Sequence, residues 1–269
     1  MGTVALKSAR LAGGPVLPYA EAGRPEGAPV VLVHGLGESW WTFEPLLRRL
    51  PAGLRVCAPT QRGHGDAERP ADGYDPEDYA RDLVRFLDAV GIGRTVLVGA
   101  GTGGVPARIV AGAYPDRIAG LVLSGVPATL DDKPGAAGLR KAVEELTDPV
   151  PASFVAEFRE RCAGPAGTSV GRGFLATMAE EAGKPPARVW RETVRGLLGT
   201  DLARTLRGIL VPTLVLWGDA DTCVPRADQR QILDAVPGAT LEVYEGAGHV
   251  LHWERPERLA QDIAAFAAP

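Results

Sequence analysis

The sequence is short of cysteine and of long apolar runs, and each shortage argues against a class of protein. Three cysteines occur among 269 residues, Cys57, Cys162 and Cys223, and no two of them have the CxxC spacing. This argues against a disulfide framework and against a cysteine-rich zinc site. The longest apolar runs have about six residues, whereas a membrane-spanning helix needs about 20. The first residues hold no apolar segment of the signal-peptide type. We therefore predict a cytoplasmic protein with no membrane partner.

An excess of positive charge is also missing. The 29 Lys and Arg residues are outnumbered by 33 Asp and Glu residues, which gives a formal charge of −4. A nucleic-acid-binding domain needs a basic face, so we predict no nucleic-acid partner and interpret Arg191 and Arg195 as solvated helix residues. The motifs contain no cluster of metal ligands, so neither a metal nor an organic cofactor is expected. The sequence indicates no oligomeric state.

Short apolar runs alternate with amphipathic stretches along most of the chain. The clearest runs cover residues 29–33, 95–98, 118–123 and 213–217, and weaker ones cover 54–57 and 240–244. Runs that are apolar on both faces are typical of buried parallel strands. Between them, apolar residues recur at helical spacing, and one such segment begins at Asp75-Pro76 and ends at Gly91. This alternation predicts an α/β fold with a mostly parallel, doubly wound sheet.

One long segment breaks this alternation. Residues 127–207 show no strand pattern, but they hold helical patches at 139–146, 154–161, 174–181 and 189–198. We predict a helical lid over residues 127–207, inserted into an α/β core formed by residues 1–126 and 208–269. The lid is expected over the carboxyl edge of the sheet, where open α/β sheets bind ligands.

A glycine-rich turn follows the predicted strand at 95–98. It reads Gly99-Ala100-Gly101-Thr102-Gly103-Gly104, and small residues on both sides of a central position are what a nucleophile elbow requires. The central position, where Ser is expected, holds Gly101. Two other interpretations are a phosphate-binding loop, which the sequence matches only loosely and without a Walker lysine, and a structural turn without chemistry.

Three further loops follow predicted strands. His34-Gly35-Leu36-Gly37 can direct a backbone N–H group into the crevice as half of an oxyanion hole, or it is a structural turn. Asp221 lies in a loop after the strand at 213–217 and can orient a histidine. His249 follows the last strand in a glycine-rich loop, whereas His252 is interpreted as a packing residue.

Together these motifs resemble the α/β-hydrolase family. The similarity runs from about residue 17 to 267 and includes Gln61-Arg62-Gly63-His64-Gly65 and the segment 246–256. The chain order of nucleophile, acid and histidine is that of the family. The resemblance implies Asp221 as the acid, His249 as the base, and the N–H groups of Leu36 and Thr102 as oxyanion donors. Thr60 stands where the family usually has Asp.

Gly101 at the nucleophile position leaves several hypotheses open. The chain is a serine hydrolase whose nucleophile is deleted, or a natural acid/base enzyme of the decarboxylase, cyclase, lyase or cofactor-free oxygenase type, or a non-catalytic ligand-binding protein. A shifted register with Thr102 as nucleophile is a further alternative, but a β-branched residue disfavours the positive φ of an elbow.

The expected substrate is a small to medium apolar ester, lactone or ketone, because the lid segment supplies large apolar side chains. Candidate substrate contacts share a place in the lid or next to the crevice: Gly35, Trp40, Trp41, Arg62, Phe158, Met178 and Trp190. For Arg62 an ion pair that stabilises the fold is the stronger alternative, and at least one of the two neighbouring tryptophans is expected in the core or against the lid.

Overall fold

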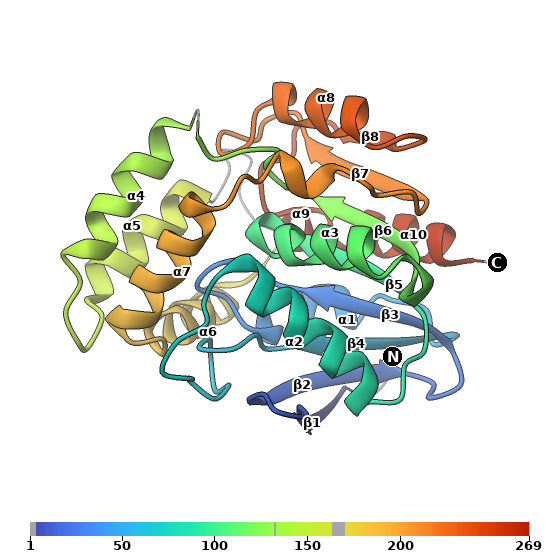
Figure 1. The fold of residues 1–269 in the computed structure, drawn as a ribbon, viewed down its shortest axis with the longest axis horizontal. Coiled ribbons are helices and arrows are strands. Elements are labelled where there is room, and N and C mark those ends of the chain that lie inside the picture. The colour runs from blue at the N-terminus through green and yellow to red at the C-terminus, as the bar shows by residue number, and fades with distance from the viewer. Residues whose placement is uncertain (1–3, 132, 163–169, 269) are drawn as a thin grey trace.

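The computed structural model describes residues 4–131, 133–162 and 170–268, and it contains one eight-stranded sheet with helices on both faces (Figure 1). The strand order is β1-β2-β4-β3-β5-β6-β7-β8, and all neighbours from β4 onward are parallel. The strand bounds are β1 Ala5–Arg10, β2 Val16–Gly23, β3 Ala28–Val33, β4 Leu54–Pro59, β5 Thr95–Ala100, β6 Ile118–Ser124, β7 Thr213–Gly218 and β8 Thr240–Tyr244. The predicted α/β fold with a mostly parallel sheet is confirmed.

Two strands escape the sequence prediction. The strands β1 and β2 form an antiparallel pair at the edge of the sheet, and β2 also pairs antiparallel with β4. Neither contains a continuous apolar run: β1 is largely exposed, and β2 contains Pro18 and Glu21. The Glu21 carboxylate is buried and bonds to Lys7 and to Arg55, the latter at 2.8 Å. A buried charge with such partners is stable in a strand. It interrupts the apolar run, however, and the strands were predicted from apolar runs.

Alternate residues of the central strands build two apolar layers. Val31 and Val33 face a layer covered by the helices α2 (Pro76–Ala89), α3 (Gly104–Ala113) and α8 (Arg226–Ala235). Val30 and Leu32 face a layer covered by α1 (Glu44–Leu47), α9 (Leu251–Glu254) and α10 (Pro256–Ala267). Strands buried on both faces need apolar residues at every position, which is why their runs are visible in the sequence.

Four helices occupy the segment between β6 and β7. They are α4 (Pro134–Glu144), α5 (Ala152–Cys162), α6 (Arg172–Gly183) and α7 (Ala187–Gly199), and the described residues of this segment form no strand. Figure 1 shows them grouped at one end of the sheet, at the carboxyl ends of the central strands. Their apolar residues pack against Leu36, which follows β3. The division into core and lid at the predicted boundaries remains a prediction.

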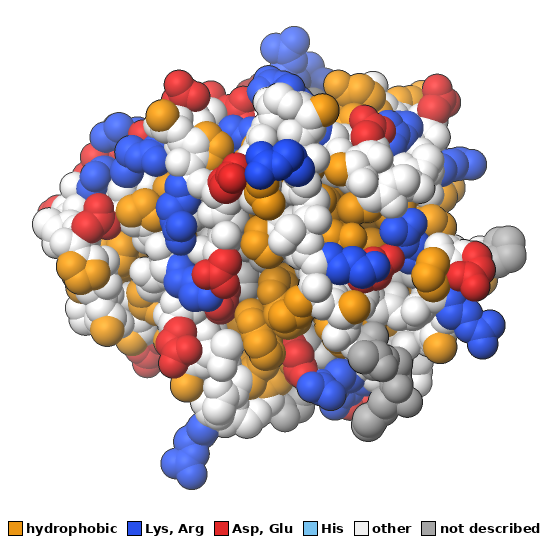
Figure 2. Space-filling view, turned by 90° about the horizontal axis from the view of Figure 1, so that it is seen from below, with side chains coloured by type: hydrophobic (Ala, Val, Ile, Leu, Met, Phe, Trp, Pro, Cys, Tyr) orange, Lys and Arg blue, Asp and Glu red, His pale blue; other side chains and the backbone are white. Residues whose placement is uncertain are grey.

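The surface mixes charges of both signs. On the face seen in Figure 2, Lys and Arg side chains alternate with Asp and Glu side chains, with apolar groups between them. In the described part of the chain, no helix has the length and apolar character needed to cross a membrane.

Candidate active site

Gly101 stands at a sharp turn between β5 and α3. Its φ is +51°, in the left-handed region that side chains rarely adopt. The flanking glycines are required by close approach: a Cβ on Gly99 would lie 2.4 Å from the Cα of Gly104, and a Cβ on Gly103 would lie 2.2 Å from the His34 carbonyl oxygen. The turn therefore has the strand–turn–helix setting and the small neighbours of a nucleophile elbow.

The Nε2 atom of His249 faces this turn, and Asp221 contacts the other ring nitrogen. The Nδ1 atom of His249 lies 2.9 Å from Oδ2 of Asp221. The other carboxylate oxygen, Oδ1, accepts the backbone N–H groups of Cys223 at 2.7 Å and Val224 at 2.9 Å, which fixes the buried carboxylate. A Cβ on Gly101 would lie 3.4 Å from Nε2 of His249. Any group placed beside Gly101 therefore meets a histidine whose orientation is set by an acid.

The charge of Asp221 also sets the basicity of His249. Burial of the ring acts to lower the pKa of His249, but the hydrogen bond and the negative charge of Asp221 outweigh it and raise this pKa to about 9. The ring therefore holds a proton strongly, and it can act as a general base only in the neutral form that prevails above about pH 9.

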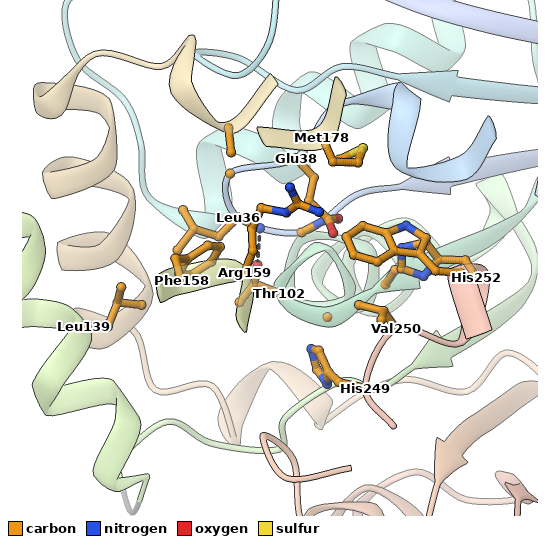
Figure 3. A pocket seen from close by; sticks show the side chains of 16 residues that line it. Leu36, Glu38, Thr102, Leu139, Phe158, Arg159, Met178, His249, Val250 and His252 are labelled. Atoms are coloured by element: carbon orange, nitrogen blue, oxygen red, sulfur yellow. Dashed lines mark hydrogen bonds between the residues drawn. The ribbon is translucent and has the colours of Figure 1, made fainter. Parts of the chain in front are cut away.

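The two proposed oxyanion loops meet, but in an arrangement that the sequence did not predict. The backbone N–H of Leu36 donates to the side-chain hydroxyl of Thr102 at 2.8 Å, drawn as a dashed line in Figure 3. A substrate oxygen that uses this N–H group has to displace the hydroxyl. The Leu36 loop is anchored by His34, whose Nε2 accepts the Gln61 N–H at 2.9 Å. Burial lowers the pKa of His34 to about 3, so this ring stays neutral.

Two cavities share Gly101 and His249. The smaller one, which we call the small cavity, has a volume of about 150 Å³ and extends from Gly101 to Trp253 (Figure 3). The larger one has a volume of about 720 Å³ and extends toward the inserted helices. Both are also lined by Leu36, Thr102, Leu139 and Phe158. A substrate whose reacting atom lies beside Gly101 can thus place one arm in each cavity.

Three of the predicted substrate contacts reach the small cavity. Gly35 lines it from the loop after β3, Phe158 from α5 and Met178 from α6. Leu36 and Thr102 also lie at its wall, next to Gly101 and His249. These residues come from five separate segments of the chain, and the sheet edge brings them together.

Four other predicted contacts are not among the residues that line either cavity. Trp40 and Trp41 stack on each other at 4.5 Å and pack into apolar clusters. Trp190 is buried against Phe154 and Phe158 and fills the space over Gly37. Trp41 and Trp190 pack in clusters that include residues of the inserted helices, whereas Trp40 packs in the layer under the sheet.

Arg62 is the fourth of these residues. Its guanidinium forms a buried two-point ion pair with Asp82, at 2.7 and 2.8 Å. This is the stabilising role that the sequence offered as its alternative, since a buried guanidinium needs a carboxylate partner. Its remaining terminal nitrogen donates to the Gly73 carbonyl oxygen at 2.5 Å.

Two charged residues of the small cavity were missed by the sequence reading. Glu38 lies two residues beyond Leu36, and its Oε2 accepts the Gly35 N–H at 2.9 Å. Arg159 follows Phe158 in α5, and its guanidinium lies over the Trp253 ring at 5.9 Å from the ring centre. Both sit in segments that the sequence did single out, so the available signal was their position next to the predicted contacts.

One group of potential metal ligands is found among the described residues. The ligand atoms of Asp221, Cys223 and His249 lie within 4.8 Å of one another. Asp221 and His249 already bond to each other, and the second oxygen of Asp221 is taken by two backbone N–H groups. The donor set is therefore committed to the acid–histidine pair, and we assign it no metal.

Comparison with known proteins gives a consistent picture. The model of the alpha/beta hydrolase family matches residues 30–262. A non-heme chloroperoxidase of Streptomyces lividans is 32% identical over 262 residues, covering 92% of this chain and 94% of that protein. A hydrolase of Pseudomonas aeruginosa superimposes with a TM-score of 0.87 at 24% identity, over 98% of both chains. A thermophilic esterase of Thermogutta terrifontis gives a TM-score of 0.85 at 25% identity, over 97% of both chains.

Proposed function

Because the chain belongs to the alpha/beta hydrolase family, we propose that it acts on a small to medium apolar ester, lactone or ketone, with His249 and Asp221 as its base. In this proposal its site is that of a serine hydrolase whose nucleophile is replaced by Gly101. The observation that carries the proposal is the orientation of the His249 ring. Its Nε2 atom would lie 3.4 Å from a Cβ atom placed on residue 101. The similarity to the thermophilic esterase of Thermogutta terrifontis supports the reaction class.

With glycine at position 101, the attacking group has to be water. Nε2 of His249 takes a proton from this water while the water oxygen adds to the substrate carbonyl carbon. The carbonyl oxygen gains negative charge, which the N–H groups of Leu36 and Thr102 stabilise. With an ester or a lactone, the intermediate then collapses, the bond between the carbonyl carbon and the leaving oxygen breaks, and this oxygen takes the proton from His249. No covalent bond to the protein forms.

The absence of a nucleophile should make hydrolysis slow. Removal of the nucleophile costs up to about 10⁶-fold in turnover, while the oxyanion hole and binding keep roughly 10³-fold over water. The larger cavity suits an apolar substrate arm, because its wall is rich in aliphatic side chains: Leu36, Leu130, Leu139, Val194, Leu197 and Leu198.

The test is to put the hydroxyl back. The Gly101 protein and Gly101→Ser would be assayed on short aryl esters and labelled with a fluorophosphonate serine probe. We expect that only Gly101→Ser is labelled, and that it hydrolyses the esters at least about 10³-fold faster. The double variant Gly101→Ser/His249→Ala is the matched control and should lose both properties. If Gly101→Ser folds but is neither labelled nor active, the hydrolase interpretation of the site fails.

A second candidate is favoured by the Leu36–Thr102 hydrogen bond. Since the Leu36 N–H donates to the Thr102 hydroxyl, this donor is not open to an ester oxyanion unless the hydroxyl moves away. A non-hydrolytic reaction of the decarboxylase, cyclase, lyase or cofactor-free oxygenase type would use His249 to remove a substrate proton. In that case His249→Ala abolishes activity of the Gly101 protein, whereas a ligand-binding protein without catalysis would still bind its ligand.

A further inference from the structure

Glu38 places a carboxyl group in a cavity whose wall is otherwise mostly apolar. The small cavity is bounded by apolar groups such as Met178, Val250 and Trp253. Figure 3 shows Glu38 and His249 reaching this space from opposite sides. The proposed hydrolysis uses His249 and leaves Glu38 without a role.

The contacts of Glu38 hold it in place without saturating it. Its Oε2 accepts the Gly35 N–H at 2.9 Å, and the Thr42 hydroxyl is also a hydrogen-bond partner. A carboxylate offers about four acceptor positions, so these two contacts leave acceptor capacity toward the cavity. Burial raises the pKa of Glu38, against the opposing effects of Gly35, Thr42 and the charge of Arg159. An acceptor kept in such surroundings gains from a hydrogen-bond donor on a bound molecule.

His252 adds a second polar atom at the same wall. Its Nε2 lies 2.8 Å from the Thr42 hydroxyl oxygen, which also receives the Trp253 indole N–H at 3.0 Å. His252 is 3% exposed, and among the described residues its Nδ1 has no hydrogen-bond partner. A buried polar atom without a partner in a residue that lines the cavity is consistent with a polar group on a bound molecule.

From this arrangement we propose that the small cavity is a subsite for a substrate end that carries a neutral hydrogen-bond donor, a hydroxyl or an amide N–H, with Glu38 as the acceptor that selects it. We expect this end of the substrate to be neutral because the cavity wall holds both a carboxyl group, from Glu38, and a guanidinium group, from Arg159. The wall therefore does not favour a ligand charge of either sign. The end is small because a cavity of about 150 Å³ is of the size that holds one benzene ring. The subsite deepens the proposed function and rests on it for the position of the reacting carbonyl beside Gly101.

The first test measures binding to the Gly101 protein and needs no turnover. Two probes differ only in a hydroxyl against a methyl group, methyl 3-hydroxybutanoate and methyl 3-methylbutanoate, and their Kd values are measured by ligand-detected NMR. We expect Glu38→Leu to shift the ratio of the two Kd values by about tenfold or more against the hydroxy probe. Glu38→Gln keeps an acceptor oxygen and should shift the ratio less. Glu26→Gln, which changes an exposed carboxylate, is the control and should leave the ratio unchanged.

The second test uses the Gly101→Ser background and the matching p-nitrophenyl esters. The preference for the 3-hydroxybutanoyl ester in kcat/KM should fall by the same factor in Glu38→Leu, mostly through KM. A ratio that stays within about twofold for folded Glu38→Leu and Glu38→Gln proteins, in binding and in turnover, overturns the subsite. If Gly101→Ser hydrolyses neither ester, the proposed function fails, while the Kd ratios of the Gly101 protein still decide the subsite.

Discussion

The two halves of the site differ in how many of the groups required for hydrolysis they contain. The base half, Asp221 and His249 after β7 and β8, has every hydrogen bond that a general base requires, with 2.9 Å between ring and carboxylate. The nucleophile half, on the loops after β3 and β5, has the elbow geometry but no side chain at Gly101, and its Leu36 N–H is bonded to Thr102. The comparison teaches that the elbow geometry is present without a nucleophilic side chain, with Gly99 and Gly103 in close contact with the neighbouring backbone.

The sharpest way to break this comparison is to disable the base half. In the Gly101→Ser background, His249→Ala should reduce kcat on aryl esters by about 10⁴ to 10⁶-fold, because the serine loses its proton acceptor. Asp221→Asn should cost less, since the histidine remains but loses its orientation and charge support. Steady-state kinetics on one ester series measures both losses.

One outcome of these measurements would contradict the role assigned to His249. If His249→Ala left the activity of Gly101→Ser within about tenfold, the histidine would not be the base that the geometry indicates. The fluorophosphonate probe then shows whether the serine is activated, because the probe labels an activated serine and not one that is merely exposed.

An effect of intermediate size is expected in the dependence of the activity on pH. A base works only when it is neutral, and the pKa of His249 is raised to about 9. The activity of Gly101→Ser should therefore rise about tenfold per pH unit below pH 9 and level off above it. Because the folded pKa lies above the ordinary value of 6.5, protonated His249 stabilises the fold fully below pH 6.5, and this contribution is lost as pH rises through 9.

Asp221→Asn supplies the control for this profile. The substitution removes the negative charge of Asp221, which raises the pKa of His249 against the desolvating effect, so the rising limb should move to lower pH. NMR titration of the His249 ring in the Gly101 protein checks the same pKa without any substrate. A ring that titrates at or below 6.5 contradicts the Asp221 contact.

The smallest expected effect concerns the nucleophile half. Thr102→Val removes the hydroxyl that accepts the Leu36 N–H and keeps the branched shape. Freed from this competition, the N–H group should bind the substrate oxyanion better, and kcat/KM of Gly101→Ser should rise by up to about tenfold. Thr102→Ser retains a hydroxyl and should change little. A fall in kcat/KM for Thr102→Val would instead make the hydroxyl itself an oxyanion donor.

Much of the fold can be predicted from the sequence, and the exceptions have a physical cause. The six strands predicted from apolar runs are present, and α2 begins after Asp75 with Pro76 in its first turn, as the capping pattern indicates. The strand β1 was missed because an edge strand that is largely exposed needs no apolar run. The strand β2 lies between β1 and β4 and was missed because its apolar residues are interrupted by Pro18 and by Glu21, which is buried through ion pairs with Lys7 and Arg55.

The sequence by itself determined the alternation of strands and helices, the glycine frame around Gly101 and the presence of Asp221 and His249 in loops after strands. These features are local, since a turn or a buried strand imposes its requirements on neighbouring residues. Only the tertiary structure decided that Thr102 bonds to Leu36, that Glu38 and Arg159 share the small cavity, and that Trp40, Trp41, Trp190 and Arg62 serve packing instead. Such contacts join segments far apart in the chain, so they depend on how the inserted helices pack against the sheet edge.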